Sequence, residues 1–220
     1  ALSETEVTGI TSELMEMVKS PAEPVRIAAL KALAALGDAG ATLFLVEHAA
    51  AASGAEQDAA LRAISRLKGA DSVILDAYRG DNEALRGALL KAIAARNIKT
   101  ATPLLIERIP NASAEERLGI MDVLTQIAEP EHLEMIVPLL LSAGEAGQGA
   151  EMAEVVATVA ERGEAGEGRV AALAKALETD ADPASRSSVY VALGKIADDG
   201  ALPLLEKGLD FRYTIYEGPH

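Results

Sequence analysis

The sequence contains no cysteine and no tryptophan, and it has only two phenylalanines and four tyrosines among 220 residues. Without cysteine, the chain forms no disulfide and offers no thiolate for catalysis or for zinc and iron–sulfur centres. The shortage of aromatic rings removes the stacking surface on which single-stranded nucleic acids are bound. Together with a net charge of −14, these absences predict that the protein does not bind nucleic acid.

Long hydrophobic runs are also missing. No stretch reaches the roughly 18 apolar residues of a membrane span, so we expect no membrane insertion. The opening ALSETEVTGI is acidic and lacks the pattern of a signal peptide. Because the chain begins at Ala1, we expect either a removed leader or a piece of a longer protein. The compartment of this soluble chain therefore stays open between the cytoplasm and, with a removed leader, the periplasm.

What the chain has in abundance is alanine and leucine, with 44 and 28 residues. This composition favours helices packed closely on helices over sheets, in which β-branched and aromatic residues prevail. A repeat runs along the sequence, with successive units 29 to 35 residues apart. Its equivalent first positions are Arg26, Gln57, Arg86, Arg117, Met152 and Arg186.

Two apolar columns accompany these anchor positions. Four residues after each anchor lie Leu30, Leu61, Leu90, Met121, Val156 and Tyr190. Seven residues after each anchor lie Leu33, Ile64, Ile93, Leu124, Val159 and Leu193. This spacing is that of a helix with one buried face, so each unit is expected to begin with an amphipathic helix.

The segments ALAALGDAGATLFLV and ALGKIADDGALPLLEKGL resemble HEAT-like repeats of the short bacterial kind first described in phycobilin lyases. The resemblance implies an all-α fold, namely a right-handed α-α superhelix of about six helical hairpins. We expect one domain over residues 1–220, with a leading helix over 3–20 that caps six repeats over 21–209. Residues 210–220, with Phe211, Tyr213 and Ile215 alternating, form either a cap on the last repeat or the start of a following domain.

The recurring arginines Arg26, Arg86, Arg117 and Arg186 allow two interpretations. They are either a ladder of ligand-binding cations or structural anchors. The resemblance implies the second role, in which the stem is packed and the head caps a turn or pairs with a carboxylate such as Asp38 or Asp199.

A partner is expected along the inner surface formed by the second helices of the hairpins. The candidate partner-binding residues are Glu47, His48, Asp76, Arg79, Glu107, Arg108, Glu131, Glu134, Lys175 and Glu178. These side chains are mixed in sign, which is also typical of an ordinary solvated face.

Residues 111–168 hold 12 acidic side chains against only Arg117 and Arg162. This charge predicts a basic protein or peptide partner, with simple solubility as the alternative. The same region carries glycines in 142–151 and 163–168, from which we expect mobile loops.

The sequence offers no set of catalytic, cofactor-binding or metal-ligating residues, so we predict no enzymatic activity and no cofactor. The predicted function is a non-catalytic scaffold that binds a protein or peptide along the groove. The alternatives are an enzyme or enzyme subunit of the chromophore-lyase type and a structural spacer in a larger protein.

Overall fold

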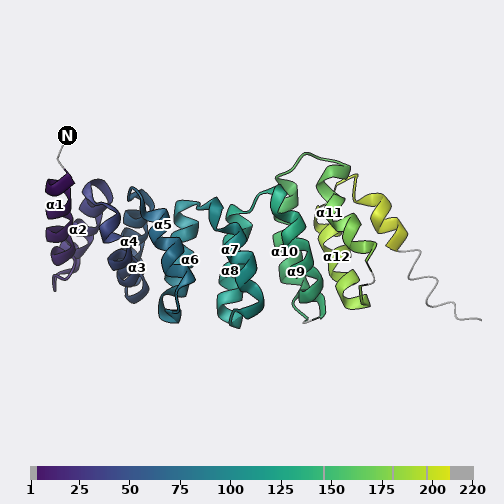
Figure 1. Cartoon of the computed structure of the whole chain (residues 1–220), viewed down its shortest axis with the longest axis horizontal. Coiled ribbons are helices and arrows are strands. Elements are labelled where there is room, and N and C mark those ends of the chain that lie inside the picture. The colour runs from purple at the N-terminus through teal and green to yellow at the C-terminus, as the bar shows by residue number, and fades with distance from the viewer. Residues whose placement is uncertain (1–3, 146, 180, 197, 209–220) are drawn as a thin grey trace, which may run out of the picture. The chain divides into compact units, whose positions relative to one another are not determined.

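The computed structural model of the protein describes residues 4–145, 147–179, 181–196 and 198–208. These residues form helices joined by short turns, and none of them lies in a β-strand, which confirms the predicted all-α class. Figure 1 labels these helices. By the contacts within it, the chain divides into two compact units. The N-terminal unit comprises residues 1–101 and 113–119, and the C-terminal unit comprises residues 102–112 and 120–220.

The N-terminal unit is built from two layers of helices. Helices α2, α4 and α6 pack on one another in succession, and α1 covers the outer side of α2. Helices α3 and α5 pack against each other and against this first layer. The bounds are α1 (Glu4–Met17), α2 (Glu23–Leu36), α3 (Thr42–Ala51), α4 (Gly54–Arg66), α5 (Ala70–Arg79) and α6 (Glu83–Arg96).

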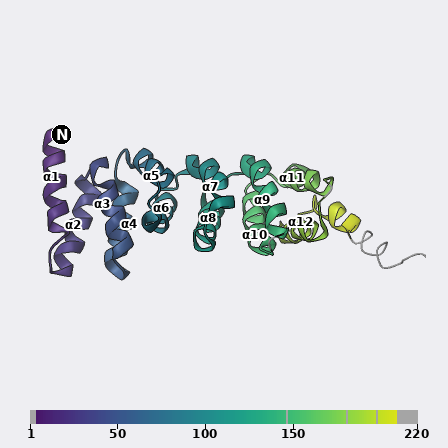
Figure 2. The same cartoon turned by 60° about the horizontal axis from the view of Figure 1, so that its bottom comes forward.

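The C-terminal unit repeats this arrangement. Helices α10 and α12 pack on each other, while α11 packs on both α9 and α12 and α7 packs on α9 (Figure 2). Helix α8 (Ala114–Ile127) begins in the N-terminal unit and continues into the C-terminal unit. The bounds are α7 (Thr102–Arg108), α9 (Leu133–Glu145), α10 (Gly149–Glu161), α11 (Glu167–Leu177) and α12 (Pro183–Ile196), followed by helical residues 202–208.

The predicted apolar columns form the core of both units. All six residues of the second column, from Leu33 to Leu193, are fully buried. In the first column Leu61 and Tyr190 are half-buried and the other four are buried. Burial of one such side chain contributes about 1.5–3 kcal/mol, so the columns supply much of the apolar stabilisation.

The helix ends follow from local sequence. Asp38 accepts a hydrogen bond from the Gly40 N–H and caps the short 3₁₀ helix η1 (Ala39–Ala41). Asp182 accepts from the N–H groups of Ala184 and Ser185 at the start of α12. These bonds satisfy amide groups that have no partner within the helix.

The leading helix expected over residues 3–20 corresponds to α1. Two of the glycines in the segment 142–151 lie within helices that pack closely. A Cβ on Gly144 would lie 2.7 Å from Cα of Ser185, and one on Gly149 would lie 2.8 Å from Cβ of Ser188. Both glycines therefore permit the end of α9 and the start of α10 to approach α12.

The expected tail over 210–220 lies outside the described residues. The 3₁₀ helix η4 (Pro130–His132) precedes α9. Pro138 lies inside α9. A proline there has no N–H to donate to the carbonyl of Glu134, so one hydrogen bond of the helix is missing.

Candidate protein-binding groove

An apolar groove lies between α9 and α11 in the C-terminal unit, with a volume of about 180 Å³. Val137, Pro138 and Leu141 line it from α9, and Ala172 and Ala176 line it from α11. The alanines leave room because they present only a methyl group where a leucine would fill the space. The three remaining lining residues are Glu134, Lys175 and Thr179.

Two of the predicted partner-binding residues meet at the rim of this groove. Nζ of Lys175 lies 3.9 Å from Oε1 of Glu134, and both side chains are more than three-quarters exposed, at 77% and 78%. An exposed pair of this kind contributes about 0–1 kcal/mol, so little is lost when one member takes another partner. The third polar residue, Thr179, donates its hydroxyl to the carbonyl oxygen of Ala176 at 2.6 Å.

Two further predicted residues lie next to the helices that form the groove. Glu131 is exposed in η4 directly before α9, and Glu178 is exposed directly after α11. Neither of them lines the groove. They add negative charge near the ends of the two helices that form it.

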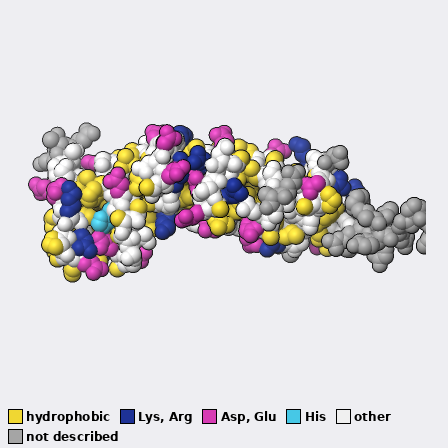
Figure 3. Space-filling view, turned by 90° about the horizontal axis from the view of Figure 1, so that it is seen from below, with side chains coloured by type: hydrophobic (Ala, Val, Ile, Leu, Met, Phe, Trp, Pro, Cys, Tyr) yellow, Lys and Arg dark blue, Asp and Glu magenta, His cyan; other side chains and the backbone are white. Residues whose placement is uncertain are grey.

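The structure places the other six predicted residues elsewhere. Asp76 and Arg79 form an exposed pair with each other on α5, at 2.8 Å. Glu47 is exposed on α3, and Glu107 is exposed on α7 beside the half-buried Arg108. On the face seen in Figure 3, acidic and basic side chains of the N-terminal unit are interspersed, with a histidine among them.

His48 is a packed residue of the N-terminal unit. Its Nε2 lies 2.8 Å from Oε1 of Glu56, and its ring stacks on Phe44 with 6.3 Å between the ring centroids. Glu56 also accepts two hydrogen bonds of 2.7 Å from Nε and Nη2 of Arg26. Arg26, and to a lesser extent His48, hold the pKa of Glu56 below its ordinary value.

The arginine anchors take part in the packing of the helices. Arg26 donates to the carbonyls of Ser20 and Pro21 in addition to Glu56. Arg86 donates to Glu116 at 3.2 Å and to the carbonyl of Gly80. Each carboxylate lies 30 residues after its arginine. The turn residue Asp38, which was expected to pair with an arginine, caps η1 instead.

The two carboxylates can be recognised in the sequence by their place beside the repeat anchors. Glu56 and Glu116 directly precede the anchor positions of the second and fourth repeats. Of the other two anchors, Arg186 donates to the carbonyls of Ala181 and Thr179, and Arg117 is half-buried on α8.

Three further arginines hold helix ends, a role that the sequence did not predict for them. Arg96 donates to the carbonyls of Ile64 and Leu67 at the end of α4. Arg162 donates in the same way to Thr125 and Ala128 at the end of α8. Arg169 pairs with Asp198 at 2.9 Å.

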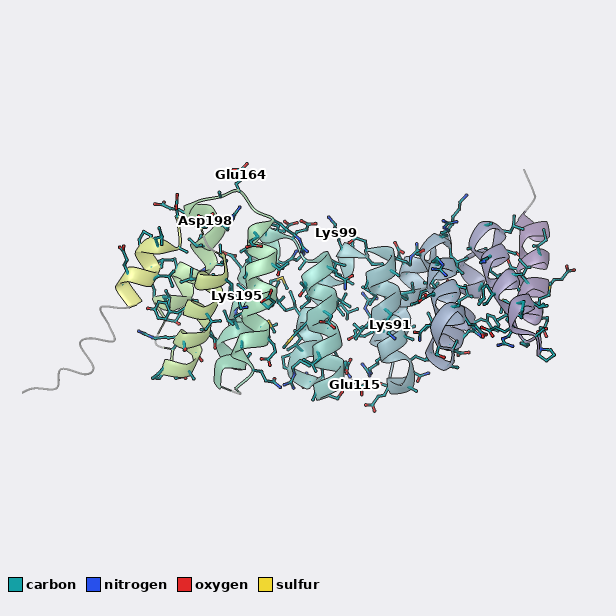
Figure 4. All side chains as sticks on the ribbon, turned by 180° about the vertical axis from the view of Figure 1, so that it is seen from behind. Lys91, Lys99, Glu115, Glu164, Lys195 and Asp198 are labelled. Atoms are coloured by element: carbon teal, nitrogen blue, oxygen red, sulfur yellow. The ribbon has the colours of Figure 1, made fainter. Side chains whose placement is uncertain are left out.

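Asp198 also accepts from the N–H of Gly166, and so it holds the glycine-containing loop between α10 and α11. Figure 4 shows Asp198 in the turn after α12 and Glu164 on that loop, pointing away from the helices.

No group of three or more metal-ligating side chains occurs among the described residues, and no described helix is long and apolar enough to span a membrane. No protein-family model matches the sequence, and no curated protein matches it. Among solved structures, the crystal structure of an engineered protein is similar to this chain, with 18% sequence identity and a TM-score of 0.43. The similarity covers 84% of this chain and 96% of that chain.

Proposed function

We propose that this protein is a non-catalytic protein-binding module that docks an apolar side chain of its partner in the α9–α11 groove. The observation that carries the proposal is the groove itself, which has an apolar floor and a loosely paired Glu134 and Lys175 at its rim. Apolar floors with polar rims are typical of the places where proteins recognise one another.

The size of the groove favours a side chain over a small-molecule substrate. Sites for small molecules and cofactors measure about 300–1,000 Å³ and enclose most of the ligand. The groove measures about 180 Å³, which suits one or two apolar side chains. This comparison favours the binding role over chemistry of the chromophore-lyase type, which requires a much larger ligand.

We also propose that the helices form HEAT-like hairpins that continue as a right-handed superhelix. The regular repeat, the two helical layers within each unit and the arginine anchors support this architecture. In such repeats the second helices carry the binding surface, and α9 and α11 are second helices in this register. A structural spacer would have the same helices but no partner in the groove.

Peptide selection tests the binding role. Peptides are selected from a random 16-residue display library against the whole chain, and their affinities are measured for three proteins. Ala172→Phe fills the groove, whereas Ala171→Phe adds the same ring at an exposed neighbouring position of α11. We expect selected peptides to bind the unaltered chain and the Ala171 variant equally, and to lose about tenfold or more with Ala172→Phe.

Circular dichroism and urea unfolding of both variants serve as the control that each of them is folded. Peptides that bind the Ala172 variant as tightly as the unaltered chain would show that the groove is not the binding site. Failure to select any peptide that depends on Ala172 would favour the spacer.

A further inference from the structure

We propose, on the basis of the binding role of the α9–α11 groove, that its partner segment is a basic amphipathic helix. An apolar side chain of this helix enters the groove, and a lysine or arginine one helical turn away takes the place of Lys175 beside Glu134. The groove thus selects its partner by both hydrophobicity and charge sign.

The polar groups of the groove favour a helix over an extended peptide. An extended segment needs donors and acceptors for its own backbone amides. Among the lining residues, only Glu134, Lys175 and Thr179 have polar side chains, and the Thr179 hydroxyl is bonded to the Ala176 carbonyl. A helix satisfies its own backbone, so it loses no hydrogen bonds when it lies on apolar walls.

The charge of the surroundings favours a basic segment. The C-terminal unit contains 19 acidic and eight basic side chains, a net charge of −11, whereas the N-terminal unit has 15 acidic and 12 basic, a net charge of −3. Several of the basic side chains are engaged. Arg162 is bonded to carbonyls, Arg169 pairs with Asp198, and Lys195 pairs with Glu154 at 2.6 Å.

At the rim of the groove, the negative charge is carried by Glu134. Glu134 presents an exposed carboxylate there, and its backbone carbonyl receives no hydrogen bond from Pro138, which has no N–H. The 3.9 Å separation from Lys175 is longer than a hydrogen bond. An incoming cation therefore replaces a weak contact and gains a better one.

Three labelled peptides test the proposal on the full chain. Each has 18 residues with leucine at positions i, i+4 and i+7, and the flanking positions carry lysine, glutamine or glutamate. Binding is measured by fluorescence anisotropy at about 0.15 M salt. We expect the lysine peptide to bind about tenfold more tightly than the glutamate peptide, with the glutamine peptide between them.

Matched variants separate the groove from the general acidity of the unit. Glu134→Gln is expected to weaken the lysine peptide roughly two- to fivefold, whereas Glu151→Gln on the exposed face of α10 leaves it nearly unchanged. Lys175→Gln removes the competing cation and tightens binding, and Lys195→Gln, which removes the same charge on α12, tightens it less. Equal effects within each pair would overturn the proposal.

A fourth peptide has the composition of the lysine peptide with a central proline that prevents the helix. We expect it to lose most of the binding, and equal affinity would overturn the helical part of the proposal.

The variant Ala172→Phe distinguishes a failure of the basic partner from a failure of the binding role. If neutral or acidic peptides bind best but still depend on Ala172, the binding role stands and the basic partner is wrong. If no peptide depends on Ala172, the binding role itself fails.

Discussion

Two arginine–glutamate pairs join neighbouring helices of the N-terminal unit, and they differ in their surroundings. Arg26 and Glu56 are joined by two hydrogen bonds in a bidentate pair, and Glu56 also contacts His48. Arg86 and Glu116 are more deeply buried, with side chains 9% and 7% exposed, and Glu116 also accepts from the Tyr78 hydroxyl at 3.1 Å. In the Arg86–Glu116 pair the side chains have almost no access to water, so the charge of each one is stabilised mainly by its partner.

We predict that Arg86→Met destabilises the protein by about 3–5 kcal/mol, because it leaves the Glu116 carboxylate buried without its cation. The double variant Arg86→Met with Glu116→Gln should recover part of this loss, because the unpaired charge is removed. Urea unfolding followed by circular dichroism measures both effects.

The control for this pair lies on α5 of the same unit. Arg79→Met breaks an exposed pair with Asp76 and should cost less than about 1 kcal/mol. Similar losses for Arg79→Met and Arg86→Met would show that burial does not determine the contribution of the ion pair.

The lowered pKa of Glu56 predicts that the stability of the protein depends on pH. Arg26 and His48 lower the pKa of Glu56 in the folded state, so the folded protein binds this proton less readily than the unfolded chain. The stabilisation is therefore complete above the ordinary pKa of glutamate and is lost as the pH falls below it through the lowered folded value.

We expect the difference in unfolding free energy between the unaltered chain and Glu56→Gln to be largest near neutral pH and to shrink as the pH falls below the ordinary glutamate range. Glu47→Gln, at an exposed position of α3, serves as the control. A difference for Glu56→Gln that stays constant from neutral pH to about pH 3 would contradict this account.

At the scale of the elements, close helix packing in the C-terminal unit depends on small residues. Gly144 and Gly149 face Ser185 and Ser188 of α12, where an added Cβ at Gly144 would meet backbone atoms. The neighbour cannot rotate away because the contacts are with Cα of Ser185 and the carbonyl of Ala184. Gly144 and Gly149 are therefore needed for this contact, while the mobility expected of the glycine-containing segments stays a prediction.

We predict that Gly144→Ala lowers the unfolding free energy by about 1–3 kcal/mol, because α9 and α12 must move apart. Gly194→Ala provides the matched control, since it also lies in the last turn of its helix but has open space around it. That variant should raise stability by up to about 1 kcal/mol through helix propensity. A stabilising Gly144→Ala, measured by urea unfolding, would show that the close contact is absent.

At the scale of the whole molecule, charge is divided unevenly between the two units. The C-terminal unit carries most of the net charge of −14, and many of its carboxylates are exposed. Mutual repulsion among them opposes the compact state and is screened by salt. We therefore expect the stability of the C-terminal unit to depend on ionic strength.

We predict that Glu161→Gln with Glu164→Gln in the C-terminal unit raises the unfolding free energy by about 0.5–1 kcal/mol at about 0.01 M salt, and that the gain disappears near 1 M. Glu13→Gln with Glu47→Gln removes the same charge from the N-terminal unit and should have a smaller effect. Urea unfolding at the two salt concentrations provides the measurement. A gain that is independent of salt would mean that repulsion is not its cause.

The sequence by itself determined the all-α class, the positions of most helices and the buried apolar column, because helical periodicity depends on neighbours three and four residues away. It also placed Glu134 and Lys175 among the candidate residues. Only the tertiary structure showed that these two meet over an apolar groove. Likewise, Arg26 and Arg86 were recognisable as anchors, but their partners Glu56 and Glu116 lie 30 residues away. Contacts over such distances depend on how successive helices pack, and the roles of Gly144, Gly149 and Pro138 depend on the same packing.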